Sequence, residues 1–510
     1  MANTFVASRT HVIWGVCLPL AILIGYLLAD PLDSGSRAVF VLLAAVLSVP
    51  LVLKWHHPLL VFAWNAAIWP AFFPGMMSLC MALGMVSFTL GVLNRAASPA
   101  NKFYCPMPVT LALIFLAAVV VGTMISTGGI GLRMLNTGKY GGKGYFYVCF
   151  AIVGFFGLVS QRIPLKRAHL YAGIFFFSGL TEAASNLIYM VGPKAYVLFN
   201  IFPVMNAASM AAASWDPTAP EGVRVAGFGL AMLAAVSGML ALHGLKGLLD
   251  LKRPWRGLIL AVAITAGAYS GFRSLMVLCG MVLVVVFFME GLHRTRMMFL
   301  VAAVTTVLGA LLLAFASELP LQVQRAISFL PVDVNPMVRQ DAQSSVDWRM
   351  EMWRSLLPEV PQYWFMGKGY LVDANALSLG YESLARGVGA RWEAAATAGD
   401  YHNGPLSLVI PFGGLGVVAF VWFLVVGGRV LFLNYHHGLG ELKNINRFIL
   451  AYFLIRVVYF VTVFGSFYQD VFIFTGLVGL SLSLNGGMRL AQPVEAEPVM
   501  EQGGLAWNDY

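Results

Sequence analysis

Residues 107–126 read MPVTLALIFLAAVVVGTMIS, twenty consecutive positions without a charged side chain. A helix of about 20 apolar residues crosses the hydrocarbon core of a bilayer, which is roughly 30 Å thick. Runs of similar length and character recur along the chain, for example at 298–316 and 405–427. Repeated runs of this kind indicate a protein that crosses a membrane many times as helices.

The composition indicates the same class. Of the 510 residues, 59% are hydrophobic and 11% are charged, against about 45–50% and about 25% in soluble domains. So few polar side chains cannot cover a water-soluble surface, which excludes a soluble multidomain enzyme and a disordered chain. The five cysteines form no CxxC pair, so the sequence predicts neither a zinc site nor a disulfide scaffold.

The apolar runs predict an all-α polytopic membrane protein with about 12–14 transmembrane helices. Two pairs of runs, 59–73/76–93 and 256–271/274–289, have almost no linker between them. Each of these pairs is either two spans or one broken or re-entrant element. The candidate spans are 12–29, 38–53, 59–73, 76–93, 107–126, 144–160, 168–190, 225–243, 256–271, 274–289, 298–316, 405–427, 447–463 and 470–485.

Lysine and arginine are distributed unevenly between the loops. With the N-terminus inside, 17 basic residues fall on the cytoplasmic side and seven in short outward loops. This excess follows the positive-inside rule and sets the orientation. The net charge of +9 is therefore explained by topology, and we expect a lipid bilayer as partner and no nucleic acid.

One segment interrupts the alternation of spans and short loops. Residues 317–404 contain no spanning run and carry ten acidic and seven basic residues. Long excursions of this kind usually carry function. We expect about 11 spans in 1–316, a large periplasmic loop with the catalytic residues at 317–404, three spans in 405–489, and a disordered cytoplasmic tail at 490–510.

The middle of this loop predicts an amphipathic helix. Ser344 and Asp347 are spaced as a capping box, and Pro358 would end the helix that they begin. Arg349 and Trp353 lie four residues apart and would share one helical face. They form either a cation–π pair at the membrane surface or part of a functional site. The aromatic turn at 361–370 would then pack on the bilayer or stack on a sugar ring.

His402 is the histidine that the predicted topology places on the outward side. Asn403 can cap the following helix, and Pro405 suits its first turn. The imidazole would then lie at the positive end of a helix macrodipole, which disfavours the imidazolium and keeps a neutral base available. A purely structural histidine at a helix end remains the alternative.

Arg273 lies between two apolar runs on the outward side. A charge there is costly in lipid, about 2.5–3.5 kcal/mol at the bilayer centre on insertion scales. Arg273 is therefore expected either to face a cavity, as an anion site, or to reach the interface. Glu182 and Arg456 fall inside spans, and a buried structural pair between them is expected rather than a proton relay.

Several catalytic motifs are missing from the sequence. It contains no P-loop, no HExxH and no DxD. Nucleotide-driven pumping, zinc hydrolysis and metal-bound sugar-nucleotide transfer therefore lose support. No cofactor and no metal site are predicted.

Four short motifs together resemble the O-antigen ligase/polymerase superfamily. They are Arg349-x3-Trp353, Phe365-Met366-Gly367-x-Gly369, His402-Asn403 and Gly413-Gly414-Leu415-Gly416. Arg273 also fits, although Phe272-Arg273-Ser274 departs from the Ser-Arg-Gly that is frequent in the family. The resemblance covers roughly residues 256–430.

The resemblance implies a metal-independent inverting glycosyltransferase with the many membrane helices of the GT-C kind. It would act at the periplasmic face of a bacterial inner membrane. The donor would be a glycan on undecaprenyl diphosphate, and the acceptor lipid A–core or a growing polysaccharide. His402 would activate the acceptor hydroxyl, and Arg273 and Arg349 would bind the diphosphate. The expected substrate-binding residues are Trp353, Arg354, Lys368 and Asn403.

The chemistry is consistent with this implication. Diphosphate is a good leaving group, so the enzyme has to stabilise negative charge, and arginine forks match phosphate oxygens. Two alternatives remain open: a polysaccharide polymerase of the same superfamily, and a lipid-linked oligosaccharide flippase. A transporter would favour charges around a midplane cavity and internal repeats, whereas the reactive-looking residues here gather in one loop.

Overall fold

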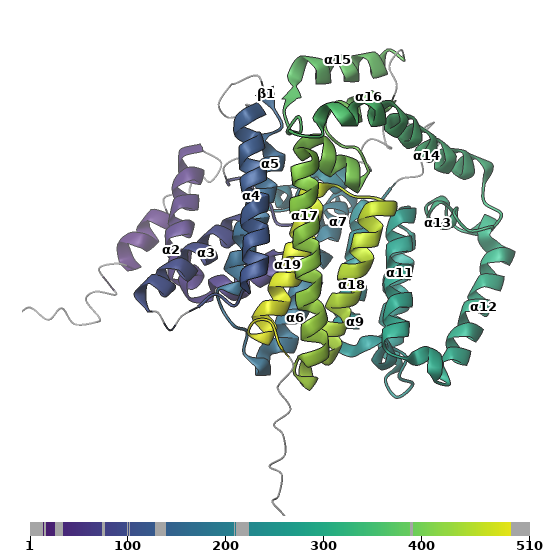
Figure 1. The fold of residues 1–510 in the computed structure, drawn as a ribbon, viewed down its shortest axis with the longest axis horizontal. Helices are drawn as coiled ribbons and strands as arrows, with labels where there is room; N and C mark the ends of the chain where they lie inside the picture. The colour runs from purple at the N-terminus through teal and green to yellow at the C-terminus, as the bar shows by residue number, and fades with distance from the viewer. Residues whose placement is uncertain are drawn as a thin grey trace, which may run out of the picture.

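The computed structural model describes residues 14, 17–25, 34–73, 77–98, 100, 102–127, 139–208, 210, 224–387 and 391–490. They form a bundle of long helices with shorter helices at one end (Figure 1). The all-α membrane fold is confirmed. The predicted tail beyond residue 490, and the ends of the first predicted span, lie outside the described residues.

The helices before the large loop begin and end as follows. They are α2 Ser34–Ala63, α3 Leu79–Ala97, α4 Met107–Thr127, α5 Gly142–Val159, α6 Ala168–Phe177, α7 Ala184–Val191, α9 Ala226–Leu248, α10 Pro254–Ala268, α11 Arg273–Met289 and α12 Met297–Phe315, with 3-10 turns η4 Ser178–Ala183 and η5 Pro193–Asn200.

The later elements complete the bundle. They are α13 Leu321–Ile327, α14 Pro336–Leu356, η8 Leu357–Tyr363, α15 Ala374–Ala385, α16 Arg391–Thr397, α17 Gly404–His437, α18 Lys443–Thr462 and α19 Phe467–Asn485, with one antiparallel pair of two-residue strands, β1 Lys139–Tyr140 and β2 Val372–Asp373.

Ten helices in the described part of the chain are long and apolar enough to cross a membrane, and α10 and α11 are shorter apolar helices. Ten is below the predicted 12–14, and the described part of the chain reaches twelve only when α10 and α11 are added. The runs 256–271 and 274–289 are two separate helices. The run 59–73 is not a separate span, because α2 continues through a kink at Trp55 to Ala63 and the following residues are irregular. Of the two possibilities left open for this pair, two full spans are thus excluded.

The most apolar helices of this bundle are not the most deeply buried ones. Helix α12 is among the most apolar and contains no buried residue, and it stands at the edge of the bundle in Figure 1. Helix α19 is less apolar, yet most of its residues are buried. Lipid is the solvent for α12, whereas α19 packs on α5, α17 and α18.

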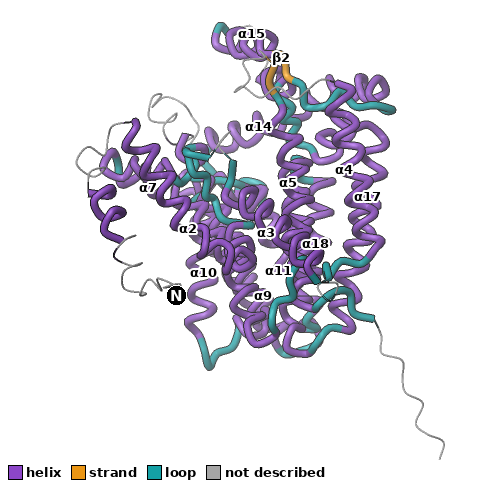
Figure 2. Tube along the Cα trace, turned by 90° about the vertical axis from the view of Figure 1, so that its left-hand side faces the viewer, coloured by secondary structure: helices purple, strands orange, loops and turns teal. Residues whose placement is uncertain are grey.

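The segment between α12 and α17 lies across one end of the bundle, with α14 and α15 at the top of Figures 1 and 2. Its contacts with the N-terminal half include two around β2. Strand β2 pairs with β1, and the Tyr145 hydroxyl accepts a hydrogen bond from the Tyr370 main-chain N–H at 2.9 Å.

A kink in α17 receives the glycine-containing turn of this segment. Gly413, with φ of 63°, breaks the helix after Pro411. The freed carbonyls of Ile410 and Pro411 accept hydrogen bonds from the N–H groups of Lys368 and Gly369, at 2.9 and 3.0 Å. A Cβ at Gly367 would lie 2.1 Å from the Pro411 carbonyl carbon, so this motif serves close backbone packing.

Candidate functional site

Helix α14 supplies much of the site, and it begins earlier than predicted. Asn335 is its N-cap and accepts a hydrogen bond from the Met337 N–H at 2.9 Å, with Pro336 in the first turn. The predicted capping box at Ser344 is therefore wrong. Ser344 lies inside the helix and donates to the Asp341 carbonyl at 3.0 Å.

A cavity of about 910 Å³ opens beside this helix, within the size range of sites that take a small-molecule ligand. Trp348 and Arg349 of α14 line it, together with His402 from the turn before α17. Arg224, Tyr459 and Phe464 line the remaining wall. Residues far apart in the sequence thus meet around one space, which is called the arginine cavity below.

His402 is held by aromatic contacts in an uncommon backbone conformation. Its φ is 48°, a positive value found at no other non-glycine residue that the structure describes, and residues held in this region usually cost free energy. Its ring lies 5.3 Å from those of Trp348 and Phe464. Its Nδ1 is 3.6 Å from the Asp400 carboxylate and makes no hydrogen bond within the described structure.

The surroundings of His402 favour its neutral form. Burial lowers the pKa of the imidazole below its usual value. Asp400 opposes this shift, and the positive charge of Arg349 adds to it. A neutral imidazole with an unbonded ring nitrogen is suited to accept a proton.

Arg349 faces the cavity with unused hydrogen-bonding capacity. Its guanidinium lies 5.7 Å from the Trp348 ring, so the predicted cation–π partner Trp353 is wrong. The Nε is buried without a hydrogen-bond partner among the described residues. Burial lowers the pKa of Arg349, and the nearby charges of Arg273 and Arg224 lower it further. A bound anion would relieve this repulsion.

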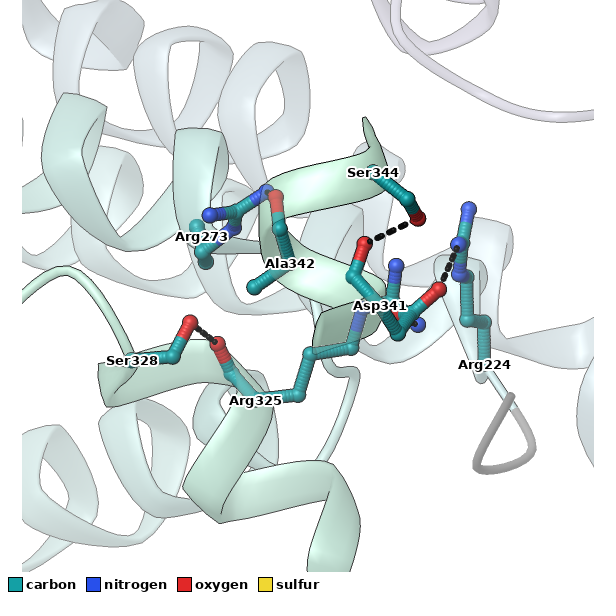
Figure 3. A network of polar contacts seen from close by, with 7 residues as sticks. All are labelled: Arg224, Arg273, Arg325, Ser328, Asp341, Ala342 and Ser344. Carbon is teal, nitrogen blue, oxygen red and sulfur yellow. Dashed lines mark hydrogen bonds and ion pairs between the residues drawn. The ribbon is translucent and has the colours of Figure 1, made fainter. Parts of the chain in front are cut away.

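Figure 3 shows the arginines that surround Asp341 of α14. Arg325 of α13 forms an ion pair with Asp341, and both side chains are buried. Arg224 lies 3.8 Å from the other carboxylate oxygen. Arg273, the first residue of α11, donates to the Ala342 carbonyl at 2.9 Å. These contacts bring charged groups from α11, from α13 and from the chain before α9 to α14.

Sequence reasoning missed Arg224, Asp341 and Arg325. The signal for Asp341 was present, because Asp341, Ser345 and Trp348 recur at helical spacing on one face of α14, and all three line the cavity. The partners on α13 and before α9 carried no signal in the sequence. Only the folded chain brings them to this helix.

Arg273 lies between two residues that line the cavity, Phe272 and Ser274, but neither it nor any of the four predicted substrate-binding residues lines the cavity itself. Trp353 donates through Nε1 to the Tyr401 carbonyl at 2.9 Å, and Asn403 caps α17 as predicted by accepting from the Leu406 N–H. Lys368 lies over the rings of Tyr363 and Tyr401.

Arg354 is exposed and does not line the cavity. The substrate-binding roles expected for Trp353, Arg354, Lys368 and Asn403 stay predictions.

The predicted pair between Glu182 and Arg456 is wrong. Arg456 of α18 instead pairs with Asp470 of α19 at 2.7 Å. Glu182 accepts a hydrogen bond from the Asn206 amide at 3.0 Å. Both residues nevertheless line a second cavity, which is discussed below.

Residues 257–421 match the sequence model of a family described as O-antigen ligase. The resemblance to the O-antigen ligase/polymerase superfamily is thereby confirmed for this part of the chain. The matched region contains Arg273, Arg349 and His402, whereas Arg224 and Arg456 lie outside it. No curated protein matches the chain.

Proposed function

We propose that this membrane protein, which carries an O-antigen ligase domain, transfers a glycan from undecaprenyl diphosphate to an acceptor hydroxyl. The reaction would take place at the periplasmic face of a bacterial inner membrane, with lipid A–core as the acceptor. One observation carries the proposal: His402 and Arg349, from separate parts of the chain, line the same cavity.

The arginines are suited to the leaving group. When the sugar–oxygen bond breaks, negative charge develops on the diphosphate. Arg349 faces the cavity, and Arg273 is close enough that its charge lowers the pKa of Arg349. Guanidinium forks bind phosphate oxygens in a bidentate manner. Fixed charges of this kind stabilise a transition state without reorganisation during the reaction.

His402 is suited to the acceptor. In the proposed step the neutral imidazole takes the proton of the acceptor hydroxyl, and the acceptor oxygen bonds to the anomeric carbon. The bond from that carbon to the diphosphate oxygen breaks at the same time, and the diphosphate leaves with the electron pair. Attack opposite the leaving group inverts the anomeric centre. The arginines supply the charge that a metal would otherwise supply, so we propose a metal-independent reaction.

A polymerase would use the same chemistry with another acceptor. The description of the matched family favours the ligase. Membranes of a host strain that lacks this gene would contain both substrates of the reaction, the lipid-linked donor and the unmodified acceptor. Adding the purified protein and identifying the product therefore separates the two: modified lipid A–core indicates a ligase, and a longer lipid-linked glycan a polymerase.

The same assay tests the role of Arg349. Arg349→Lys keeps the charge and loses the bidentate fork, so transfer should fall by about 10²–10³-fold, as for loss of one oxyanion-hole donor. The matched control is Arg386→Lys, since Arg386 is exposed and paired with Glu382. EDTA should leave the rate unchanged. If Arg349→Lys transferred glycan at nearly the wild-type rate, at equal protein level, Arg349 would have no role in stabilising the diphosphate.

A further inference from the structure

A second cavity, of about 710 Å³, lies among the helices. Its wall carries several aromatic side chains, including Trp64, Trp69, Tyr147 and Tyr468. Lys143 and Glu182 line it as well. It is called the aromatic cavity below. Because it combines ring faces with charged and amide groups, it differs from a channel for a lipid tail, which needs apolar walls.

The backbone around this cavity is irregular, although it lies next to or within helices that are long and apolar enough to cross a membrane. Residues 64–73 leave the helical path after α2, and η4 interrupts the span from Leu165 to Val191. Their polar groups bond to one another and to the residue that follows η5. The Ala67 N–H donates to Thr181 Oγ1 at 2.8 Å, and the Trp69 N–H donates to the Ile201 carbonyl at 2.7 Å. Irregular backbone inside a membrane is tolerated where it lines a polar cavity or is buried in protein.

Two polar groups in the wall point to a ligand with hydroxyl groups. The Tyr370 hydroxyl is buried without a hydrogen-bond partner among the described residues. The Lys143 ammonium lies over the rings of Trp69 and Tyr147, at 4.8 and 5.6 Å from their centroids. Unpaired buried polar groups are rare in proteins, so a ligand that hydrogen-bonds to the Tyr370 hydroxyl would satisfy it. The exposed Lys143 ammonium is a second donor in the same wall.

The two cavities share part of their walls. Leu230, Leu275, Tyr459 and Phe464 line both of them. The His402 ring lies 5.3 Å from the Phe464 ring in this shared wall. Ala398 and Gly399, just before His402 in the sequence, line the aromatic cavity. The candidate base therefore stands at the boundary between the two spaces.

We propose that the aromatic cavity binds a sugar unit of the acceptor and presents its hydroxyl towards His402. This inference rests on the proposed transferase function and adds the acceptor site to it. The carbon-bound hydrogens of a sugar pack on aromatic faces, while its hydroxyls both donate and accept hydrogen bonds. Trp69 and Tyr147 line the wall with the Lys143 ammonium over one face of each ring, and a sugar would pack on the faces that Lys143 leaves open. Tyr370, Lys143 and Glu182 offer the polar groups. The arginine cavity is left for the diphosphate of the donor.

The test measures transfer against acceptor concentration, in vesicles that contain the purified protein and substrates from the gene-deleted host strain. Trp69→Ala should raise the KM for the acceptor at least tenfold and leave the KM for the donor within twofold. Trp255→Ala is the matched control, because Trp255 is exposed and lines neither cavity. An unchanged acceptor KM in Trp69→Ala would overturn the acceptor site.

A second variant covers the case in which Trp69→Ala does not fold. Tyr370→Phe removes a hydroxyl that makes no hydrogen bond to the described protein, so the fold should be unaffected. Its acceptor KM should rise by about three- to tenfold, the usual effect of one hydrogen bond. The free glycan released from the acceptor by mild acid should compete with the acceptor in wild-type protein and more weakly in Tyr370→Phe.

The outcomes separate the two proposals. If the wild-type protein transfers no glycan, the proposed function fails and the acceptor site fails with it. A different set of results removes the acceptor site alone. In that case the wild-type protein transfers glycan and Arg349→Lys loses transfer, which supports the transferase. Both Trp69→Ala and Tyr370→Phe, however, keep the wild-type acceptor KM.

Discussion

The two cavities each have a buried arginine–aspartate pair in or beside their walls, and the pairs differ in their surroundings. Beside the aromatic cavity, Asp470 accepts from Arg456 Nε at 2.7 Å and from the Ser466 N–H at 2.9 Å. Its carboxylate is thus satisfied by one arginine and the backbone. At the arginine cavity, Asp341 has Arg325 on one oxygen and Arg224 at 3.8 Å from the other.

This difference distinguishes a structural ion pair from an anion site. A guanidinium balanced by its own carboxylate holds two helices together, as Arg456 and Asp470 hold α18 and α19. At the arginine cavity, Arg325 and Arg224 both approach one carboxylate, and Arg349 lines the same space with a buried Nε that has no hydrogen-bond partner among the described residues. That unused donor favours an incoming anion. Both cavities contain arginine, so the presence of arginine alone would not have separated them.

The largest effect is expected at His402, which stands between the two cavities. His402→Ala should bind donor and acceptor normally and lose transfer by about 10²–10⁴-fold, the usual contribution of a general base. Single-turnover rates and donor binding, measured separately, check this.

His402→Gly should lose transfer to the same extent as His402→Ala. It should unfold at the same temperature as His402→Ala or at a higher one, because glycine adopts positive φ without strain. A His402→Ala protein with a normal rate would leave the residue a structural one.

The next largest effect concerns stability at the structural pair. Asp470→Asn leaves Arg456 buried without a counter-charge, which should destabilise the fold by about 3–5 kcal/mol. Replacing both residues, as Arg456→Met with Asp470→Leu, should recover most of this loss. Thermal unfolding in detergent measures both variants. Asp400→Asn is the control, since Asp400 is half-exposed and its loss should change little. Equal stability of Asp470→Asn and wild type would contradict the structural role.

A smaller and graded effect is expected from pH. Burial and Arg349 lower the pKa of His402 below its usual 6.5, so the imidazole is neutral and active at pH 7. As pH falls through that lowered pKa, the base becomes protonated and kcat/KM should decrease about tenfold per pH unit. The inflection should therefore lie below pH 6.5 and be absent from the residual activity of His402→Gln. An inflection above 6.5 would mean that Asp400, and not burial, dominates the site.

Much of the fold was predictable from the sequence, because spanning helices are set by long apolar runs. The difference at 59–73 has a physical reason. Apolar residues face lipid on a helix and equally fill an irregular buried segment, so hydropathy does not distinguish them. Pro70 and Trp69 in that run belong to the wall of a cavity or the turn beside it, which the sequence gives no means of detecting.

The site was predictable in part, because His402 and Arg349 lie in motifs of the resembling family. The supporting groups were not, since Arg325 and Arg224 reach Asp341 only through tertiary contacts. The prediction at Ser344 overlooked Asn335-Pro336, a capping residue followed by a proline in the first helical turn. Two capping patterns in one stretch compete, and the structure uses the first.

The smallest effect on glycan transfer is expected from substitution of Arg354. Because Arg354 and Arg349 both belong to α14, they allow two arginines of one helix to be compared. Arg354 follows Arg349 by five residues, so at 3.6 residues per turn it lies about 140° around α14 from it. Its side chain is exposed and does not line the arginine cavity. Substitution of such a residue usually changes free energies by less than about 0.5 kcal/mol, so Arg354→Ala should transfer glycan within about twofold of wild type. The transfer assay with Arg349→Ala alongside measures the contrast. If the two variants lost transfer equally, the donor would have to contact the outer face of α14. The diphosphate site would then have to be moved out of the cavity that contains His402.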